Sequence, residues 1–86
     1  MIPSTGKERR TLKSMAKVRT VDIKIGKKGL TENAIKEIKI VLERDKMIKV
    51  AFSQEKIKRA ELVKTLEDSL NSTLIELVGK TATFVI

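Results

Sequence analysis

Apolar side chains follow two different spacings on either side of a short stretch rich in glycine and lysine. Val21, Ile23 and Ile25 alternate with polar residues, which predicts a strand over 20–25. Beyond the stretch, apolar residues recur every three or four positions, which predicts a helix over 32–44 with one buried side. Its apolar positions are Ala34, Ile35, Ile38, Val41 and Leu42. The stretch between strand and helix is therefore a corner.

The N-terminal part of the chain predicts another helix. It begins at Ser4 or Thr5 and ends near Lys17, and residues 1–4 before it are expected to be a loose end. Its buried stripe is predicted to consist of Leu12, Met15 and Ala16. Further along, residues 47–52 alternate again, which predicts a second strand. In that strand Ile48, Val50 and Phe52 share one face and Lys49 lies on the other.

The remaining elements are a helix and a hairpin. A turn with a plausible cap at 53–55 leads into a third helix, which ends near Leu70 because Asn71 and Ser72 stop it. Two further strands are predicted over 73–78 and 81–86, joined by a tight turn at Gly79 and Lys80. The predicted apolar side of the third helix consists of Ile57, Leu62, Val63, Leu66 and Leu70.

The predicted order is α-β-α-β-α-β-β, which indicates one α/β domain spanning residues 1–86. Strands joined through helices are expected to run parallel with right-handed crossovers, so that only the final hairpin is antiparallel. This gives a two-layer domain in which helices pack against a four-stranded mixed sheet.

The corner Gly26-Lys27-Lys28-Gly29 has the chemistry of a phosphate clamp. Glycine lets the chain turn tightly and lets a ligand approach the backbone. Thr31 stands where a helix N-cap belongs, so the first free N–H groups and the positive end of the helix dipole face the corner. The alternative is a plain turn whose two lysines are merely solvated, because short motifs of this kind are common.

Positive charge is concentrated in the N-terminal third. The chain has a formal net charge of +8. Residues 1–30 carry nine basic and two acidic side chains, whereas residues 31–86 carry ten and nine. Such asymmetry suggests a polyanionic partner. The first helix contributes Lys7, Arg9, Arg10 and Lys13, and connectivity allows it to share one edge of the domain with the corner.

The composition argues against several other classes of function. The chain has no cysteine and no histidine, so disulfides, zinc sites of the Cys/His kind and the usual general base are ruled out. Its carboxylates have the pattern of solvated pairing charges, and we expect no enzyme activity, no metal and no cofactor. No apolar run approaches the length of a membrane span, and no signal peptide is evident, so we expect a cytoplasmic protein.

Several segments together resemble the CRM (chloroplast RNA splicing and ribosome maturation) domain. They are Gly6-Lys7-Glu8-Arg9-Arg10, Leu12-Lys13-Ser14-Met15-Ala16, the corner from Ile25 to Thr31, Ile48-Lys49-Val50 and Val78-Gly79-Lys80-Thr81. The likeness runs from about Thr5 to Ile86 in the family's order, and it is strongest to the stand-alone prokaryotic members, the YhbY-like proteins.

That resemblance implies a fold similar to the C-terminal domain of bacterial translation initiation factor three. It also implies RNA binding through the loop at 26–29 and association with precursors of the large ribosomal subunit. Plant organelle relatives act in intron splicing. The chain departs from the family where histidines often follow the first helix, since Lys17-Val18-Arg19 stands there. It also has Phe84-Val85-Ile86 in place of an aromatic-basic pair, so we leave that strand out of the site.

The leading hypothesis is a monomeric protein that binds structured RNA, in particular ribosomal RNA or a precursor of the large subunit. Contacts to phosphates would supply affinity, and the scarcity of aromatic residues argues against base stacking. The alternatives are an RNA chaperone or intron-splicing cofactor, a DNA-binding protein, and a basic adaptor for an acidic protein partner. The candidate RNA-binding residues are Lys7, Arg9, Arg10, Lys13, Gly26, Lys27, Lys28, Gly29 and Thr31.

Overall fold

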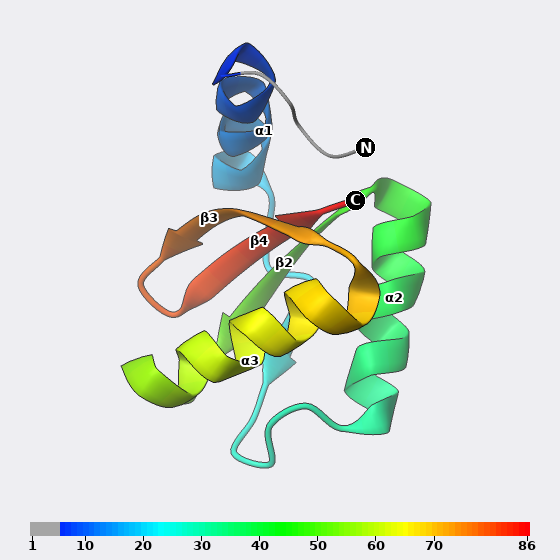
Figure 1. The fold of residues 1–86 in the computed structure, drawn as a ribbon, viewed down its shortest axis with the longest axis vertical. Coiled ribbons are helices and arrows are strands. Elements are labelled where there is room, and N and C mark those ends of the chain that lie inside the picture. The colour runs from blue at the N-terminus through cyan, green and yellow to red at the C-terminus, as the bar shows by residue number, and fades with distance from the viewer. Residues whose placement is uncertain (1–5) are drawn as a thin grey trace.

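The fold is an α/β arrangement of three helices and four strands, seen in a computed structural model that describes residues 6–86 (Figure 1). The loose end expected at 1–4 and the helix start expected at Ser4 or Thr5 lie outside the described residues. The predicted order α-β-α-β-α-β-β is confirmed. The elements are α1 (Gly6–Val18), β1 (Ile23–Ile25), α2 (Glu32–Asp45), β2 (Met47–Phe52), α3 (Lys56–Leu70), β3 (Thr73–Val78) and β4 (Thr81–Val85).

The four strands form one mixed sheet in the order β1-β2-β4-β3. β1 and β2 pair in parallel, as expected for strands joined through a helix. β4 lies between β2 and β3 and is antiparallel to both. The expectation that only the final hairpin is antiparallel was therefore wrong, because β4 folds back into the gap between the two strands that α3 connects.

The main core lies between the sheet and the pair α2 and α3. Ile48, Val50 and Phe52 of β2 and Phe84 of β4 point to this side and are at most 3% exposed, which confirms the predicted facing of β2. The helices contribute Ile38, Leu42, Leu62, Val63 and Leu66. These elements make the expected two layers.

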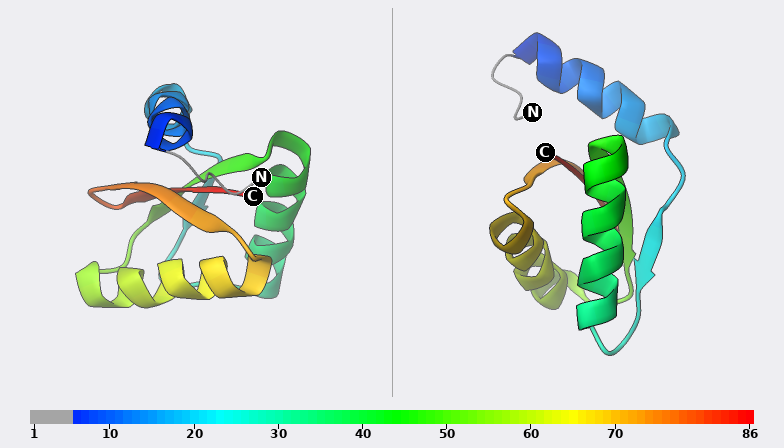
Figure 2. Two further views of the ribbon diagram at one scale, coloured as in Figure 1. Left: turned by 45° about the horizontal axis from the view of Figure 1, so that its top comes forward. Right: turned by 90° about the vertical axis from the view of Figure 1, so that its right-hand side faces the viewer.

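α1 packs on the opposite face of the sheet (Figure 2, left). Leu12 packs there against a small cluster of Met47, Ile75 and Val85, and Ala16 is fully buried. Met15 is 52% exposed, so its predicted burial was wrong. The reason is that α1 meets the sheet along a narrower stripe than its apolar residues suggest.

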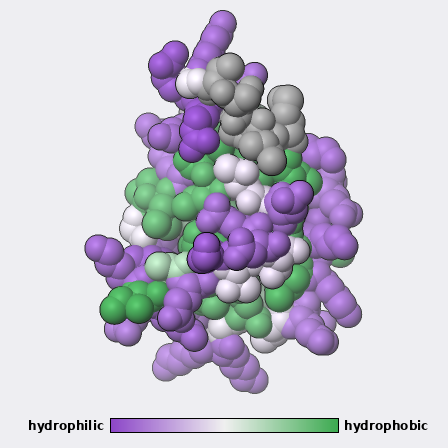
Figure 3. All heavy atoms as spheres, viewed as in Figure 1, coloured by the Kyte–Doolittle hydropathy of each residue, from purple (hydrophilic) through white to green (hydrophobic). Residues whose placement is uncertain are grey.

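The third helix also buries a narrower stripe than predicted. Ile57, in its first turn, is 75% exposed because α3 begins beyond the edge of the sheet's core. Exposed Leu77 and Val78 lie at the end of β3. Figure 3 shows a mostly hydrophilic surface with apolar groups on its left side, where α3 begins and β3 ends.

Local chemistry explains where the helices begin and end. Thr31 caps α2 as predicted, since its Oγ1 accepts the N–H of Ala34 at 3.1 Å. Asn71 ends α3 in the left-handed conformation at φ 50°, as its position predicted. At the start of α3 the N-cap is Glu55, which makes no side-chain capping bond, so the cap expected at 53–55 is not formed.

Candidate nucleic-acid interface

The corner is a tight turn with both lysines at its tip. The N–H of Gly29 donates to the carbonyl oxygen of Gly26 at 3.0 Å, which closes the turn around Lys27 and Lys28. Gly29 has φ +75°, a left-handed conformation that glycine adopts without steric cost. Both lysine side chains are exposed, and neither makes an ion pair within residues 6–86. The turn therefore presents two free cations.

Gly26 differs from Gly29, because nothing in the fold itself requires a glycine there. Its φ is not in the left-handed region, and a Cβ added to it would meet no atom within 4 Å. The carbonyl of Gly26 accepts hydrogen bonds within the fold, but the side of its Cα where a Cβ would stand faces open space. The absence of a side chain at this point matters only for something outside the chain that approaches the backbone.

The loop between β2 and α3 holds the corner in place through hydrogen bonds. Ser53 donates both its N–H and its hydroxyl to the carbonyl oxygen of Ile25, at 3.1 and 3.0 Å. The side-chain amide nitrogen of Gln54 donates to the carbonyl oxygen of Gly26. Arg59 donates in turn to the backbone oxygen of Gln54 at 3.1 Å. These bonds fix the backbone on which the lysines stand.

The start of α2 adds less to the site than the sequence suggested. Thr31 already satisfies one of the helix's free N–H groups, and the carboxylate of Glu32 stands in the first turn. A negative side chain at this position interacts favourably with the helix dipole and competes with an external anion. The two lysines therefore supply most of the attraction at the corner.

The basic residues of α1 do not join the corner. Lys7, Arg9, Arg10 and Lys13 are exposed along the helix, which lies at one end of the molecule while the corner lies at the other (Figures 1 and 2). The molecule measures 36 Å along its longest axis. The expectation that the first helix and the corner share one edge of the domain was therefore wrong. Residues 19–22 set the direction of α1, and they turn it away from the corner.

The inner end of α1 is fixed by a lysine from the sheet. The ammonium group of Lys49 donates to the carbonyl oxygens of Ala16 and Arg19, at 2.9 and 3.0 Å. The last carbonyls of a helix lack partners within the helix, and a cation satisfies them and favours the negative end of the dipole. Lys49 thus caps α1 from a strand 30 residues further along the chain.

An ion-pair network joins the same region to α2. Arg19 binds Asp22 at 2.8 Å and Asp45 at 2.7 Å, and Arg44 binds Asp45 at 3.0 Å. Hydrogen bonds from Arg44 and Arg19 hold the pKa of Asp45 well below its ordinary value. Hydrogen bonds to Asp22 and Asp45 raise the pKa of Arg19. The network orients α1 without using the basic residues on its outer side.

Sequence reasoning missed several residues that shape the site. Ser53 and Gln54 gave no signal, since their bonds to residues 25 and 26 span 28 positions. Lys24 did give a signal in the sequence, because it alternates with Ile23 and Ile25 and therefore lies on the face of β1 opposite to theirs. Its side chain is exposed beside the corner.

Other kinds of site find little support within residues 6–86. No group of three or more histidine, cysteine, aspartate or glutamate residues is placed to hold a metal ion there. In the same part of the chain, no helix combines the length and apolar character needed to cross a membrane.

Comparison with known proteins gives consistent matches over most of the chain. A family model described as the CRS1 / YhbY (CRM) domain matches residues 5–85. A curated Bacillus subtilis (strain 168) protein, "Probable RNA-binding protein YqeI", is 33% identical over 78 residues, which are 90% of this chain and 81% of that protein. The solution structure of the hypothetical protein SAV1595 from Staphylococcus aureus is similar with a TM-score of 0.81. It is 33% identical, and the match covers 96% of this chain and 88% of that one.

Proposed function

Because the chain belongs to the CRS1 / YhbY (CRM) domain family, we propose that it is an RNA-binding protein whose corner at 26–29 grips the phosphate backbone. The observation that carries this proposal is the corner's geometry. Two lysines that make no ion pair among residues 6–86 stand on a turn held in place by Ser53 and Gln54, and beside them the Cα of Gly26 is open to a ligand. The name of the Bacillus subtilis relative supports RNA as the partner.

The RNA is expected to be recognised by its shape. Phe52 and Phe84 are both buried, at 3% and 1% exposure, and the sequence has no other aromatic residue, so no ring is available for base stacking. Lysine contacts to phosphates position a protein without reading bases. The basic side of α1 supplies a second contact region with its residues Lys7, Arg9, Arg10 and Lys13.

Within the family, the resemblance to YhbY-like proteins favours ribosomal RNA and a role in assembly of the large subunit. We expect the protein to act there as a monomer. A role as an RNA chaperone or in intron splicing would use the same contacts on a different RNA.

The test compares binding of a large-subunit ribosomal RNA fragment and of duplex DNA across a salt series. The double variant Lys27→Asp, Lys28→Asp should lose most of its RNA affinity. Its log–log salt slope should flatten by about 0.7 to 0.9 for each lost contact. The double variant Lys36→Asp, Lys39→Asp is the matched control, because it makes the same charge change on the exposed side of α2.

Equal losses in the two double variants would mean that only net charge matters, and the corner would not be a clamp. Wild-type affinity in the corner variant would overturn the proposal for this site and favour an acidic protein partner. Melting curves for both variants ensure that binding is compared between folded proteins.

A further inference from the structure

The space between α1 and the corner is an open part of the sheet. Alternate residues of a strand point to opposite faces, so the face toward α1 can be followed row by row. The row at the end of the sheet near α1 contains Met47 and Val85, which Leu12 covers. In the next row, Lys49 pairs with Thr83 and Thr83 with Glu76.

No other element among residues 6–86 covers the row nearest the corner. Lys24 lies beside Ala51, Ala51 beside Thr81, and Thr81 beside Val78 across the four strands. Val78 is 63% exposed, Lys24 is exposed, and the two residues between them are half-buried and small. We name Lys24, Ala51 and Thr81, with Lys49 and Lys17 at the end near α1, the open sheet face. Thr83, in the row above, is only 2% exposed and lies beneath this face.

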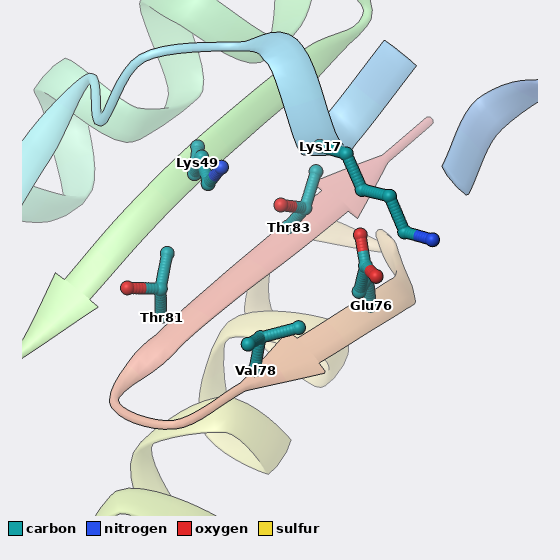
Figure 4. Close-up of a pocket in the computed structure, with 6 residues that line it drawn as sticks. All are labelled: Lys17, Lys49, Glu76, Val78, Thr81 and Thr83. Atoms are coloured by element: carbon teal, nitrogen blue, oxygen red, sulfur yellow. The ribbon is translucent and has the colours of Figure 1, made fainter. Parts of the chain in front are cut away.

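Two hollows lie on this face, one toward each end. The first is lined by Lys17 from α1 and by Lys49, Thr81 and Thr83 from the sheet, whose side chains project from the same side of the strands (Figure 4). The second is lined by Lys24, Gly26, Ala51 and Ser53, at the corner itself. Because the side chains between the hollows are small, the face allows a ligand to approach the strands.

The side of this face formed by β1 and β2 is positively charged and suits a polyanion, whereas the side formed by β3 carries an acidic residue. Lys17 and Lys24 are exposed and make no ion pair within the described chain. Lys49 adds positive charge near α1, but its ammonium group is engaged by the carbonyl oxygens of Ala16 and Arg19. Glu76 is the acidic residue of the first hollow. The pairing register of β3 shifts between Leu74 and Glu76. Such bulges commonly redirect a side chain, and here the shift accompanies the placement of Glu76 on this face.

We propose that the sugar-phosphate backbone of an RNA strand crosses the open sheet face, running from Lys17 over β2 and β1 to Lys24 and the corner. The proposal rests on the proposed RNA-binding function and extends it to a continuous path joining the two basic regions. Glu76 marks the border of the path, since its carboxylate repels phosphates on the side of β3. The hydroxyl of Thr81, which is half-buried, can donate to a phosphate oxygen along the way.

The experiment measures binding of the same ribosomal RNA fragment to the double variant Lys17→Glu, Lys24→Glu. Loss of a lysine–phosphate contact at about 0.1 M salt corresponds to roughly five- to eightfold in affinity. The double variant should therefore lose at least about 25-fold, with a flatter salt slope. The matched control is Lys36→Glu, Lys64→Glu, on the exposed sides of the two helices behind the sheet.

A second variant tests the path without changing charge. Ala51→Leu places a larger side chain in the middle of the face and should weaken RNA binding while the melting temperature stays near that of the wild type. Amide signals of Ala51 and Thr81 should shift when the RNA fragment is added to the wild-type protein.

The outcomes separate this inference from the proposed function. If Lys17→Glu, Lys24→Glu and Ala51→Leu bind like the wild type while the corner variant loses affinity, the path is wrong and the clamp stands. If the corner variant also keeps its affinity, the proposed function fails and the path fails with it. A loss equal to that of the matched control would also overturn the path.

Discussion

Gly26 and Gly29 stand at the two ends of one turn, and the structure gives them different roles. At Gly29 an alanine would have to adopt φ +75°, which costs an L-residue about 1 to 2 kcal/mol. At Gly26 an alanine meets no neighbour and no strained φ. We therefore expect Gly29→Ala to lower the free energy of unfolding by about that amount, and Gly26→Ala to leave it nearly unchanged.

Comparing Gly26→Ala with Gly29→Ala distinguishes effects on stability from effects on RNA binding. If the proposed clamp is right, Gly26→Ala should weaken RNA binding in spite of its normal stability, because the new methyl group would stand in the way of the phosphate backbone. Denaturant titration and RNA binding of both variants test this expectation. Unchanged RNA affinity in Gly26→Ala would show that no ligand comes near this backbone.

Residues that act through local chemistry were predictable from the sequence, and residues that act at a distance were not. Thr31 and Asn71 lie beside the helix ends that they define, so these two residues predicted where the helices begin and end. Gln54 holds Gly26 across 28 positions, and no local pattern contains that bond. The exposure of Met15 and Ile57 could not be read from periodicity either, because periodicity defines a helix face without showing how far the sheet covers it.

Among the elements, α1 depends most on contacts from elsewhere in the chain. Lys49→Met keeps most of the side chain's length and apolar character and removes the charge that caps the last carbonyls of α1. Hydrogen bonds to charged groups contribute roughly 1.5 to 3 kcal/mol, so we expect a comparable loss of stability. Amide hydrogen exchange should quicken in α1 more than in α2 or α3. Uniform exchange changes across all three helices would contradict the capping role.

The course of α1 also shows where prediction from sequence reaches its limit. The helix itself and its basic side were correctly expected. Its separation from the corner was not, because the four residues 19–22 and their ion pairs set its direction. Arg19 pairs with Asp45, 26 positions away, and such a pairing has no local signature.

At the scale of the whole molecule, the network around Asp45 connects α1, the approach to β1 and the end of α2. Because Arg44 and Arg19 depress the pKa of Asp45 in the folded protein, the carboxylate stabilises the fold at pH values above its ordinary pKa of about 4. That contribution is lost as the pH falls below this value. We expect Asp45→Asn to lower the melting temperature at neutral pH and to reduce its decline between about pH 5 and 2.

Melting curves of both proteins over this pH range provide the measurement. Parallel declines for the wild type and Asp45→Asn would show that other carboxylates account for the acid sensitivity.

The position of β4 has a consequence for how the protein assembles. β4 is the last element in sequence, yet it hydrogen-bonds to β2 on one side and β3 on the other. Until it docks, both neighbours have unpaired edges, and the cluster around Phe84 is incomplete. Such edges invite pairing with other chains. The protein is therefore most prone to aggregation just before β4 docks. A mutation that delays the docking of β4 should reduce the yield of soluble protein more than it reduces the stability of the folded state.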